Sequence, residues 1–124
     1  MFLPVGYRDM EKSFRSITVG LLVPDPEEAL HWYQQFLGDH QELRPSAGVV
    51  EMEMLPYVWI QFIRGNAKPG TSVFRLGVED IYEMKYDLDS LDILTGEIHE
   101  VPGKVRYFQL MDPYGYSLSF YQEL

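Results

Sequence analysis

Side chains suited to acid–base or metal chemistry are few in this 124-residue sequence, and they are scattered. The three histidines are His31, His40 and His99, and their positions do not converge on one segment. An imidazole acts as a base or a metal ligand only where partner groups lie beside it. Because none of the three falls on a strand expected to carry a site, we interpret them as residues of helix or loop surfaces.

Two glutamates form the only closely spaced carboxylate pair within an apolar segment. Glu51 and Glu53 alternate with Val50, Met52 and Met54. This alternation is typical of a strand with one buried side and one wet side. We interpret the glutamates as the wet side, and a catalytic carboxylate pair is the weaker alternative.

Several classes of active site are excluded by residues and motifs that the sequence lacks. There is no cysteine, which excludes disulfides, thiolate metal sites and cysteine nucleophiles. No glycine-rich phosphate loop, Ser-His-Asp order or zinc-ligand spacing occurs. Any chemistry must therefore come from residues brought together by the fold.

The charge of the chain restricts its partners. A formal net charge of -9 disfavours nucleic acid and anionic membranes, so we expect no nucleic-acid or membrane partner. Cationic or neutral small molecules fit better, although such acidity can also serve solubility alone. No run of about 18 apolar residues and no leader segment occurs, so the expected location is cytoplasmic.

The elements that must position a site follow an order that occurs twice: one strand, one helix and three strands. The first strand is predicted over residues 16–23. A helix follows, because Asp25 can cap it, proline comes next and Glu28 completes a capping box. Gly38 can adopt the left-handed backbone conformation that commonly ends a helix. The buried stripe of this helix consists of Ala29, Trp32, Tyr33, Phe36 and Leu37.

The other elements are separated by turn-forming residues. In the first unit, strands are predicted over residues 41–44, 49–54 and 57–63, with a connection over 64–70. In the second unit, strands are predicted over 72–78, 93–98, 105–111 and 116–121, with a helix over 80–88. The clearest hairpin joins the last two strands, since Asp112-Pro113-Tyr114-Gly115 has the residues of a type I turn.

Both ends of this pattern resemble a known superfamily. The opening Ile17-Thr18-Val19-Gly20-Leu21-Leu22-Val23-Pro24-Asp25, with Ala29-Leu30-His31-Trp32-Tyr33, and the closing Asp112-Pro113-Tyr114-Gly115-Tyr116-Ser117-Leu118-Ser119-Phe120-Tyr121 are similar to vicinal oxygen chelate proteins. These include glyoxalase I, extradiol dioxygenases, fosfomycin-resistance enzymes and bleomycin-resistance proteins. The resemblance implies an α+β fold of paired βαβββ modules that form a cup-shaped mixed sheet with helices outside. It also implies one domain over residues 1–124, with modules at 16–64 and 71–122, an extension at 1–15, and a homodimer.

The metal-ligand positions of the superfamily can be placed on this sequence through the same resemblance. They fall on Thr18, Gln61, Val73 and Ser119. None of these residues carries the carboxylate or imidazole that divalent cations require. We therefore predict no metal and no other cofactor. The alternative is a divalent ion such as Zn, Ni, Mn or Fe, if the register of a strand is misplaced by one residue.

Residues two apart on a strand share one face, so neighbours of the former ligand positions should line the cup. Gln61 and Gln109 could donate and accept hydrogen bonds, and Arg75 could pair with a carboxylate or phosphate. Trp59 and Tyr107 could stack on a planar group. The predicted ligand-binding residues are Tyr57, Trp59, Gln61, Arg75, Tyr107, Gln109, Ser119 and Tyr121, with Ile63, Met111 and Ser117 on the same face. Alternatively, the aromatics only pack, and Arg75 forms an internal salt bridge with Glu51 or Glu53.

The expected function is binding: a metal-free protein that sequesters or senses a small, partly aromatic and possibly cationic compound. One alternative is an enzyme. It would be a metal-dependent lyase or dioxygenase, or a metal-free isomerase that uses Tyr107, Tyr121 or Glu53. A second alternative is an interaction module whose function is dimerisation.

Overall fold

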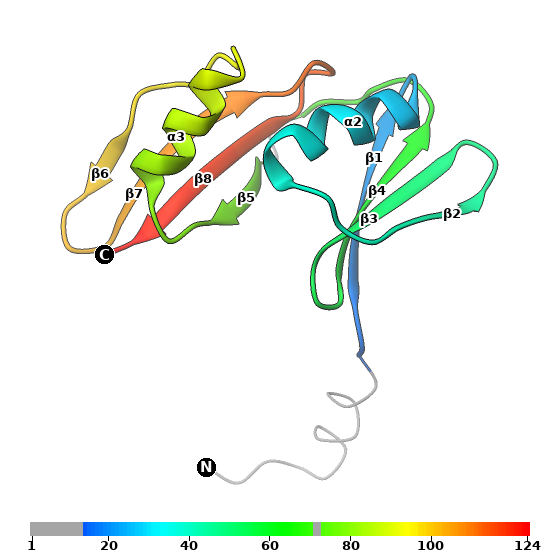
Figure 1. Ribbon diagram of the computed structural model, residues 1–124, viewed down its shortest axis with the longest axis horizontal. Helices are drawn as coiled ribbons and strands as arrows, with labels where there is room; N and C mark the ends of the chain where they lie inside the picture. The colour runs from blue at the N-terminus through cyan, green and yellow to red at the C-terminus, as the bar shows by residue number, and fades with distance from the viewer. Residues whose placement is uncertain (1–13, 71–72) are drawn as a thin grey trace, which may run out of the picture. The chain divides into compact units, whose positions relative to one another are not determined.

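The structure is a computed structural model that describes residues 14–70 and 73–124 (Figure 1). The chain divides after Gly65 into two compact units, here called unit 1 and unit 2. Each unit has the order strand, helix and three strands, with a four-stranded mixed sheet. The predicted α+β fold of paired βαβββ modules is thereby confirmed. That both units form one domain with an extension over residues 1–15 stays a prediction, and most of that extension lies outside the described residues.

Unit 1 contains one helix and one sheet. Its elements are β1 (Ile17–Val23), α2 (Pro26–Leu37), β2 (Glu42–Ser46), β3 (Val49–Leu55) and β4 (Val58–Arg64). The strand order is β1-β4-β3-β2, in which β1 runs parallel to β4 and the other neighbours are antiparallel. The first strand of the module therefore lies beside its last strand.

Helix α2 begins and ends where the sequence predicts. The Asp25 carboxylate accepts hydrogen bonds from the backbone N–H groups of Glu27 and Glu28, at 3.1 and 3.3 Å. At the other end Gly38 has φ +82°, a conformation that favours glycine. One side of the helix packs on the sheet, and the Tyr33 and Phe62 rings are 5.1 Å apart. The fully buried residues of this layer include Ala29, Leu30, Tyr33, Met52, Ile60 and Phe62.

Unit 2 repeats this architecture. Its elements are β5 (Val73–Gly77), α3 (Ile81–Ser90), β6 (His99–Val101), β7 (Val105–Met111) and β8 (Ser117–Glu123), in the strand order β5-β8-β7-β6. Asp80 caps α3 as Asp25 caps α2. The fully buried residues of this unit are Ile81, Leu88, Phe108 and Leu118, and Phe120 is 1% exposed. Within the described residues of each unit, the helix covers one side of the sheet and no helix of that unit covers the other side, here called its helix-free face.

The predicted type I turn between β7 and β8 is confirmed. The Gly115 N–H donates to the Asp112 carbonyl at 3.1 Å, which closes the four-residue turn. The Asp112 carboxylate, only 4% exposed, accepts from the N–H groups of Tyr114 and Tyr116 at 2.9 and 2.8 Å. This turn sets the register in which Met111 lies opposite Ser117.

Several predicted strand bounds differ by one or two residues, as in β2, which runs from Glu42 to Ser46, and two differences concern candidate residues or a whole strand. Tyr57 follows Pro56 in the turn between β3 and β4 and is 68% exposed, with φ +66°, the positive φ that a type II turn requires at its second central residue. Residues 93–98 form no strand; β6 begins at His99 instead. The preceding segment is held by the Lys85 ammonium, which donates to the Thr95 hydroxyl and the Gly96 carbonyl. Ser72, the predicted start of β5, lies outside the described residues.

Candidate ligand-binding faces

The helix-free face of unit 1 gathers residues from three strands. Residues opposite one another in register point to the same side of a pleated sheet. Ile60 and Phe62 face α2, so Trp59, Gln61 and Ile63 point to the other side. The register then defines two rows on this face: Thr18, Trp59 and Glu53 in one, and Gly20, Gln61 and Glu51 in the next.

Both glutamates of β3 lie on this same face. The Gln61 side-chain amide donates to the Glu51 carboxylate at 2.9 Å, and both side chains are half-buried. The Glu53 carboxylate accepts from the backbone N–H of Tyr57 at 3.2 Å. On sequence alone, these glutamates are not among the candidate ligand residues. The structure instead places each of them directly opposite one, because β3 and β4 pair in register.

The helix-free face of unit 2 carries the other candidates in three rows. Ser119 lies between Arg75 and Gln109, and Tyr121 lies between Gly77 and Tyr107. A third row consists of Val73, Ser117 and Met111. The predicted residues Arg75, Tyr107, Gln109, Ser119 and Tyr121 therefore share one side of one sheet. Of the eight predicted residues, Tyr57 alone lies in a turn rather than on a strand.

Arg75 and Tyr121 contact each other on this face. The Arg75 guanidinium carbon lies 4.9 Å from the centroid of the Tyr121 ring, within the range of a cation–π contact. Arg75 is exposed, and within the described residues of unit 2 no acidic side chain pairs with it. The predicted salt bridge with Glu51 or Glu53 stays a prediction.

One histidine was missed by the sequence analysis. His99 lies on β6 directly opposite Tyr107, and the two rings are 5.5 Å apart. Its side chain therefore belongs to the helix-free face of unit 2, in contrast to the predicted loop position. Only the pairing of β6 with β7 reveals this, since three residues are too short for an alternation signal. His31 is exposed on α2, and His40 contacts the Leu37 carbonyl at the helix end.

The positions that the resemblance implies for a metal, Thr18, Gln61, Val73 and Ser119, carry no carboxylate or imidazole. Gln61 lies opposite Gly20 on β1, and Ser119 lies opposite Arg75 on β5. Neither Gly20 nor Arg75 offers a side-chain ligand to a divalent ion. Across residues 14–70 and 73–124, no three His, Cys, Asp or Glu side chains gather in a way that could hold a metal.

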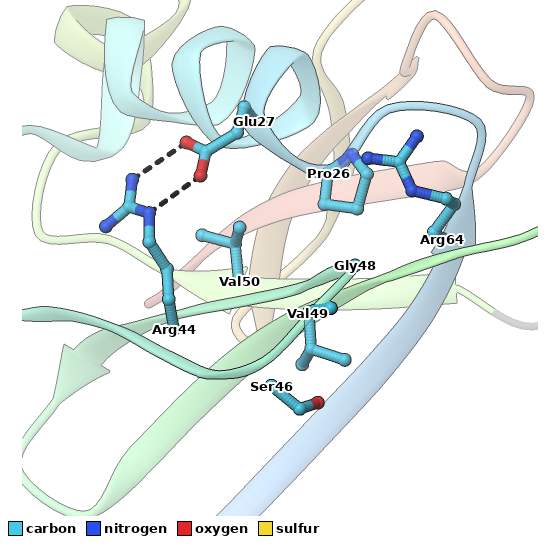
Figure 2. Close-up of a pocket in the computed structure, with 9 residues that line it drawn as sticks. Pro26, Glu27, Arg44, Ser46, Gly48, Val49, Val50 and Arg64 are labelled. Atoms are coloured by element: carbon cyan, nitrogen blue, oxygen red, sulfur yellow. Dashed lines mark hydrogen bonds and ion pairs between the residues drawn. The ribbon is translucent and has the colours of Figure 1, made fainter.

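A separate pocket of about 250 Å³ lies between the start of α2 and the β2–β3 hairpin (Figure 2). Figure 2 shows Glu27 facing Arg44 across it, with Arg64 beside Pro26. The Arg44 guanidinium donates two hydrogen bonds of 2.7 Å to Glu27 and one of 2.9 Å to Glu42. Hydrogen bonding from Arg44 holds the pKa of Glu27 below its ordinary value of 4.5. Because these charges are mutually satisfied, and none of the predicted ligand residues lines the pocket, we place the candidate site elsewhere.

Solved structures share this architecture over most of their length. A glyoxalase/bleomycin resistance protein from Catenulispora acidiphila DSM 44928 matches with a TM-score of 0.70 and 19% identity, covering 90% of this chain and all of that one. Lactoylglutathione lyase from Agrobacterium tumefaciens matches with a TM-score of 0.70 and 17% identity, covering 86% of this chain and 91% of that one. The fosfomycin resistance protein FosX from Listeria monocytogenes matches with a TM-score of 0.72 and 13% identity, covering 90% of this chain and 93% of that one.

The chain has the vicinal oxygen chelate fold. The resemblance seen at residues 17–25 and 112–121 is thus confirmed at the level of the fold. No protein-family model matches the sequence, and no curated protein sequence matches it significantly. Proteins with the vicinal oxygen chelate fold include the lyase and the resistance proteins above, so the residues on the two helix-free faces must decide the function. Within the described residues, no helix is long and apolar enough to cross a membrane.

Proposed function

We propose that this protein binds a small, partly aromatic compound without a metal ion, and sequesters or senses it. The observation that carries the proposal is the helix-free face of unit 1. There the half-buried Trp59 lies directly opposite Glu53, and the Gln61–Glu51 pair forms the next row. An indole provides a flat surface for stacking, and an adjacent carboxylate favours a cationic group on the stacked compound.

The charge of the chain supports the same ligand class. Glu51 and Glu53 are both half-buried, so their negative charges are less screened than those of fully exposed carboxylates. The net charge of -9 adds a long-range attraction for cations. A cationic or neutral aromatic compound is therefore the ligand that this face favours.

Binding without a metal is proposed because of the donor chemistry. Thr18, Gln61, Val73 and Ser119 replace the ligands that a metal-dependent lyase or dioxygenase would need. Elemental analysis of protein purified without chelator is expected to show no stoichiometric Zn, Ni, Mn or Fe. A stoichiometric metal would instead favour the enzyme.

The binding test uses the two tryptophans of the chain, Trp32 and Trp59. Trp32 packs against Tyr33 and Phe36 on α2, so the conservative Trp32→Phe variant leaves Trp59 as the single indole. A library of cationic and neutral aromatic compounds, antibiotics included, is screened by thermal shift. Hits are expected to quench Trp59 emission in Trp32→Phe and to bind Trp59→Ala at least about tenfold more weakly. A library without hits, or hits insensitive to Trp59→Ala, would contradict the proposal.

We also propose a homodimer, which rests on the superfamily resemblance. Light scattering coupled to size-exclusion chromatography measures the mass in solution. A mass of twice 14.5 kDa is expected, and a monomer at micromolar concentration would exclude a stable dimer.

A further inference from the structure

The centre of the helix-free face of unit 2 holds three hydrogen-bonding side chains in one row. Arg75, Ser119 and Gln109 lie directly beside one another on β5, β8 and β7. Each can donate a hydrogen bond, and Arg75 carries a positive charge. Within residues 73–124, none of the three side chains makes a hydrogen bond or an ion pair with another described side chain. The row therefore has neighbouring donors that no described side chain of unit 2 uses.

Tyr121 holds the arginine of this row in position. Its ring lies over Gly77 on the neighbouring strand, where an added Cβ would come within 3.1 Å of the ring and hydroxyl atoms. Glycine at position 77 thus allows the ring to lie on β5, and the guanidinium of Arg75 lies over that ring. A guanidinium over an aromatic face keeps the N–H groups on its edge free to donate.

We propose that Arg75, Ser119 and Gln109 form a binding site for the carboxylate group of an aromatic ligand, with Tyr121 on Gly77 as the platform that positions Arg75. The inference rests on the proposed small-molecule function and adds the chemical group that unit 2 recognises. A carboxylate is planar and accepts two parallel hydrogen bonds from a guanidinium. Neighbouring strands are about 4.8 Å apart, so the serine hydroxyl and the glutamine amide lie within reach of the same group.

The charge of the chain supports a carboxylate over a more highly charged anion. Ser119 is only 2% exposed, and the longer side chains of Arg75 and Gln109 lie on either side of it in the row. A phosphate dianion would be repelled more strongly than a carboxylate by a chain of net charge -9. Tyr107 and Tyr121 in the adjacent row provide the aromatic contact for the rest of the ligand.

Sodium benzoate is the probe, with benzamide and phenylphosphate as matched compounds. The full chain is titrated with each and followed by ¹⁵N NMR of the arginine side chains and of the amides in β5 and β8. Benzoate is expected to shift the Arg75 Nε–H and these amides in a saturable way. Benzamide, which has the same shape without the charge, is expected to bind at least about tenfold more weakly, and phenylphosphate is expected to bind more weakly than benzoate.

Variants separate the roles of the residues. Arg75→Gln is expected to weaken benzoate binding at least about tenfold. Arg75→Lys is expected to weaken it by less, because lysine keeps the positive charge but lacks the two parallel N–H donors of a guanidinium. Gly77→Ala keeps Arg75 and displaces Tyr121, so a loss of about two- to fivefold is expected. Arg106→Gln is the control. The Arg106 side chain points to the side of the sheet opposite Gln109, and it pairs with Glu100.

Three results would overturn the carboxylate site: equal binding of benzoate and benzamide, tighter binding of phenylphosphate, or benzoate binding that Arg75→Gln leaves unchanged. Arg75 is exposed, so its substitution should not disturb the fold, and the amide spectrum of each variant checks this. Library hits that depend on Trp59, without saturable benzoate binding at Arg75, would remove this inference and leave the proposed function standing. Benzoate binding at Arg75 without any library hit would support the carboxylate site and contradict the function proposed for unit 1.

Discussion

Gln61 and Glu51 lie directly opposite each other on β4 and β3, and the Gln61 amide donates a hydrogen bond of 2.9 Å to the Glu51 carboxylate. The pair links two strands on the side of the sheet opposite α2. Its effect is to orient an amide and a negative charge beside Trp59, which lies in the next row. The chemistry proposed for unit 1 depends on this register.

Glu51→Gln tests the charge of that pair. The variant keeps the size of the side chain and removes the carboxylate, so cationic library hits are expected to bind about tenfold more weakly. Neutral hits should change by less than about threefold. Isothermal titration calorimetry measures both. Glu28→Gln, at an exposed position on α2, serves as the control. An equal loss for cationic and neutral hits would show that the variant acts through the fold and not through charge.

Phe62→Ala and Trp59→Ala test the assignment of the two sides of β4. Phe62 is fully buried against Tyr33, so its truncation is expected to reduce the free energy of unfolding by about 3–5 kcal/mol. Trp59 is half-buried on the helix-free face, and its truncation should cost clearly less. Urea unfolding followed by circular dichroism compares the two. A larger loss for Trp59→Ala would mean that the sides are reversed.

Asp112→Ala tests the turn that sets the register of the last hairpin. The buried carboxylate of Asp112 accepts two backbone hydrogen bonds, and their loss is expected to cost about 1–3 kcal/mol of stability. Asp112→Asn keeps an acceptor oxygen and should lose less. The comparison by thermal or urea unfolding is decisive: if both variants lose the same stability, the side-chain acceptor does not stabilise the turn.

The Glu27–Arg44 ion pair predicts a pH dependence. Hydrogen bonding from Arg44 lowers the folded-state pKa of Glu27 below 4.5, so the pair stabilises the fold above that pH. The contribution is lost as the pH falls through the lowered pKa. Glu27→Gln is therefore expected to lower Tm by about 1–3 °C at pH 7, a small effect because the pair is exposed, and the difference should shrink in acid.

Glu28→Gln is the matched control for this measurement. Glu28 lies in the same helical turn, and among the described contacts it makes no ion pair with Arg44. A Tm difference between Glu27→Gln and the wild type that stays constant from pH 7 to pH 3 would contradict the assignment to this ion pair.

Much of the fold could be predicted because local chemistry decides it. The cap at Asp25, the stop at Gly38 and the turn beginning at Asp112 each depend on neighbours within a few residues. His99 was placed wrongly for the opposite reason, since the short strand that begins there exists because it pairs with β7. Tyr57 was assigned to β4, which begins one residue later, at Val58.

Local patterns in the sequence sufficed to predict the element order, both ends of α2 and the alternation of residues on most strands. The four positions that the resemblance implies for a metal also carry no carboxylate or imidazole. The pairing of strands was needed to show that Glu51 lies opposite Gln61, and that Arg75, Ser119 and Gln109 lie in one row. Alternation separates the two sides of a strand, but hydrogen bonding between strands distant in the chain decides which residues of each become neighbours.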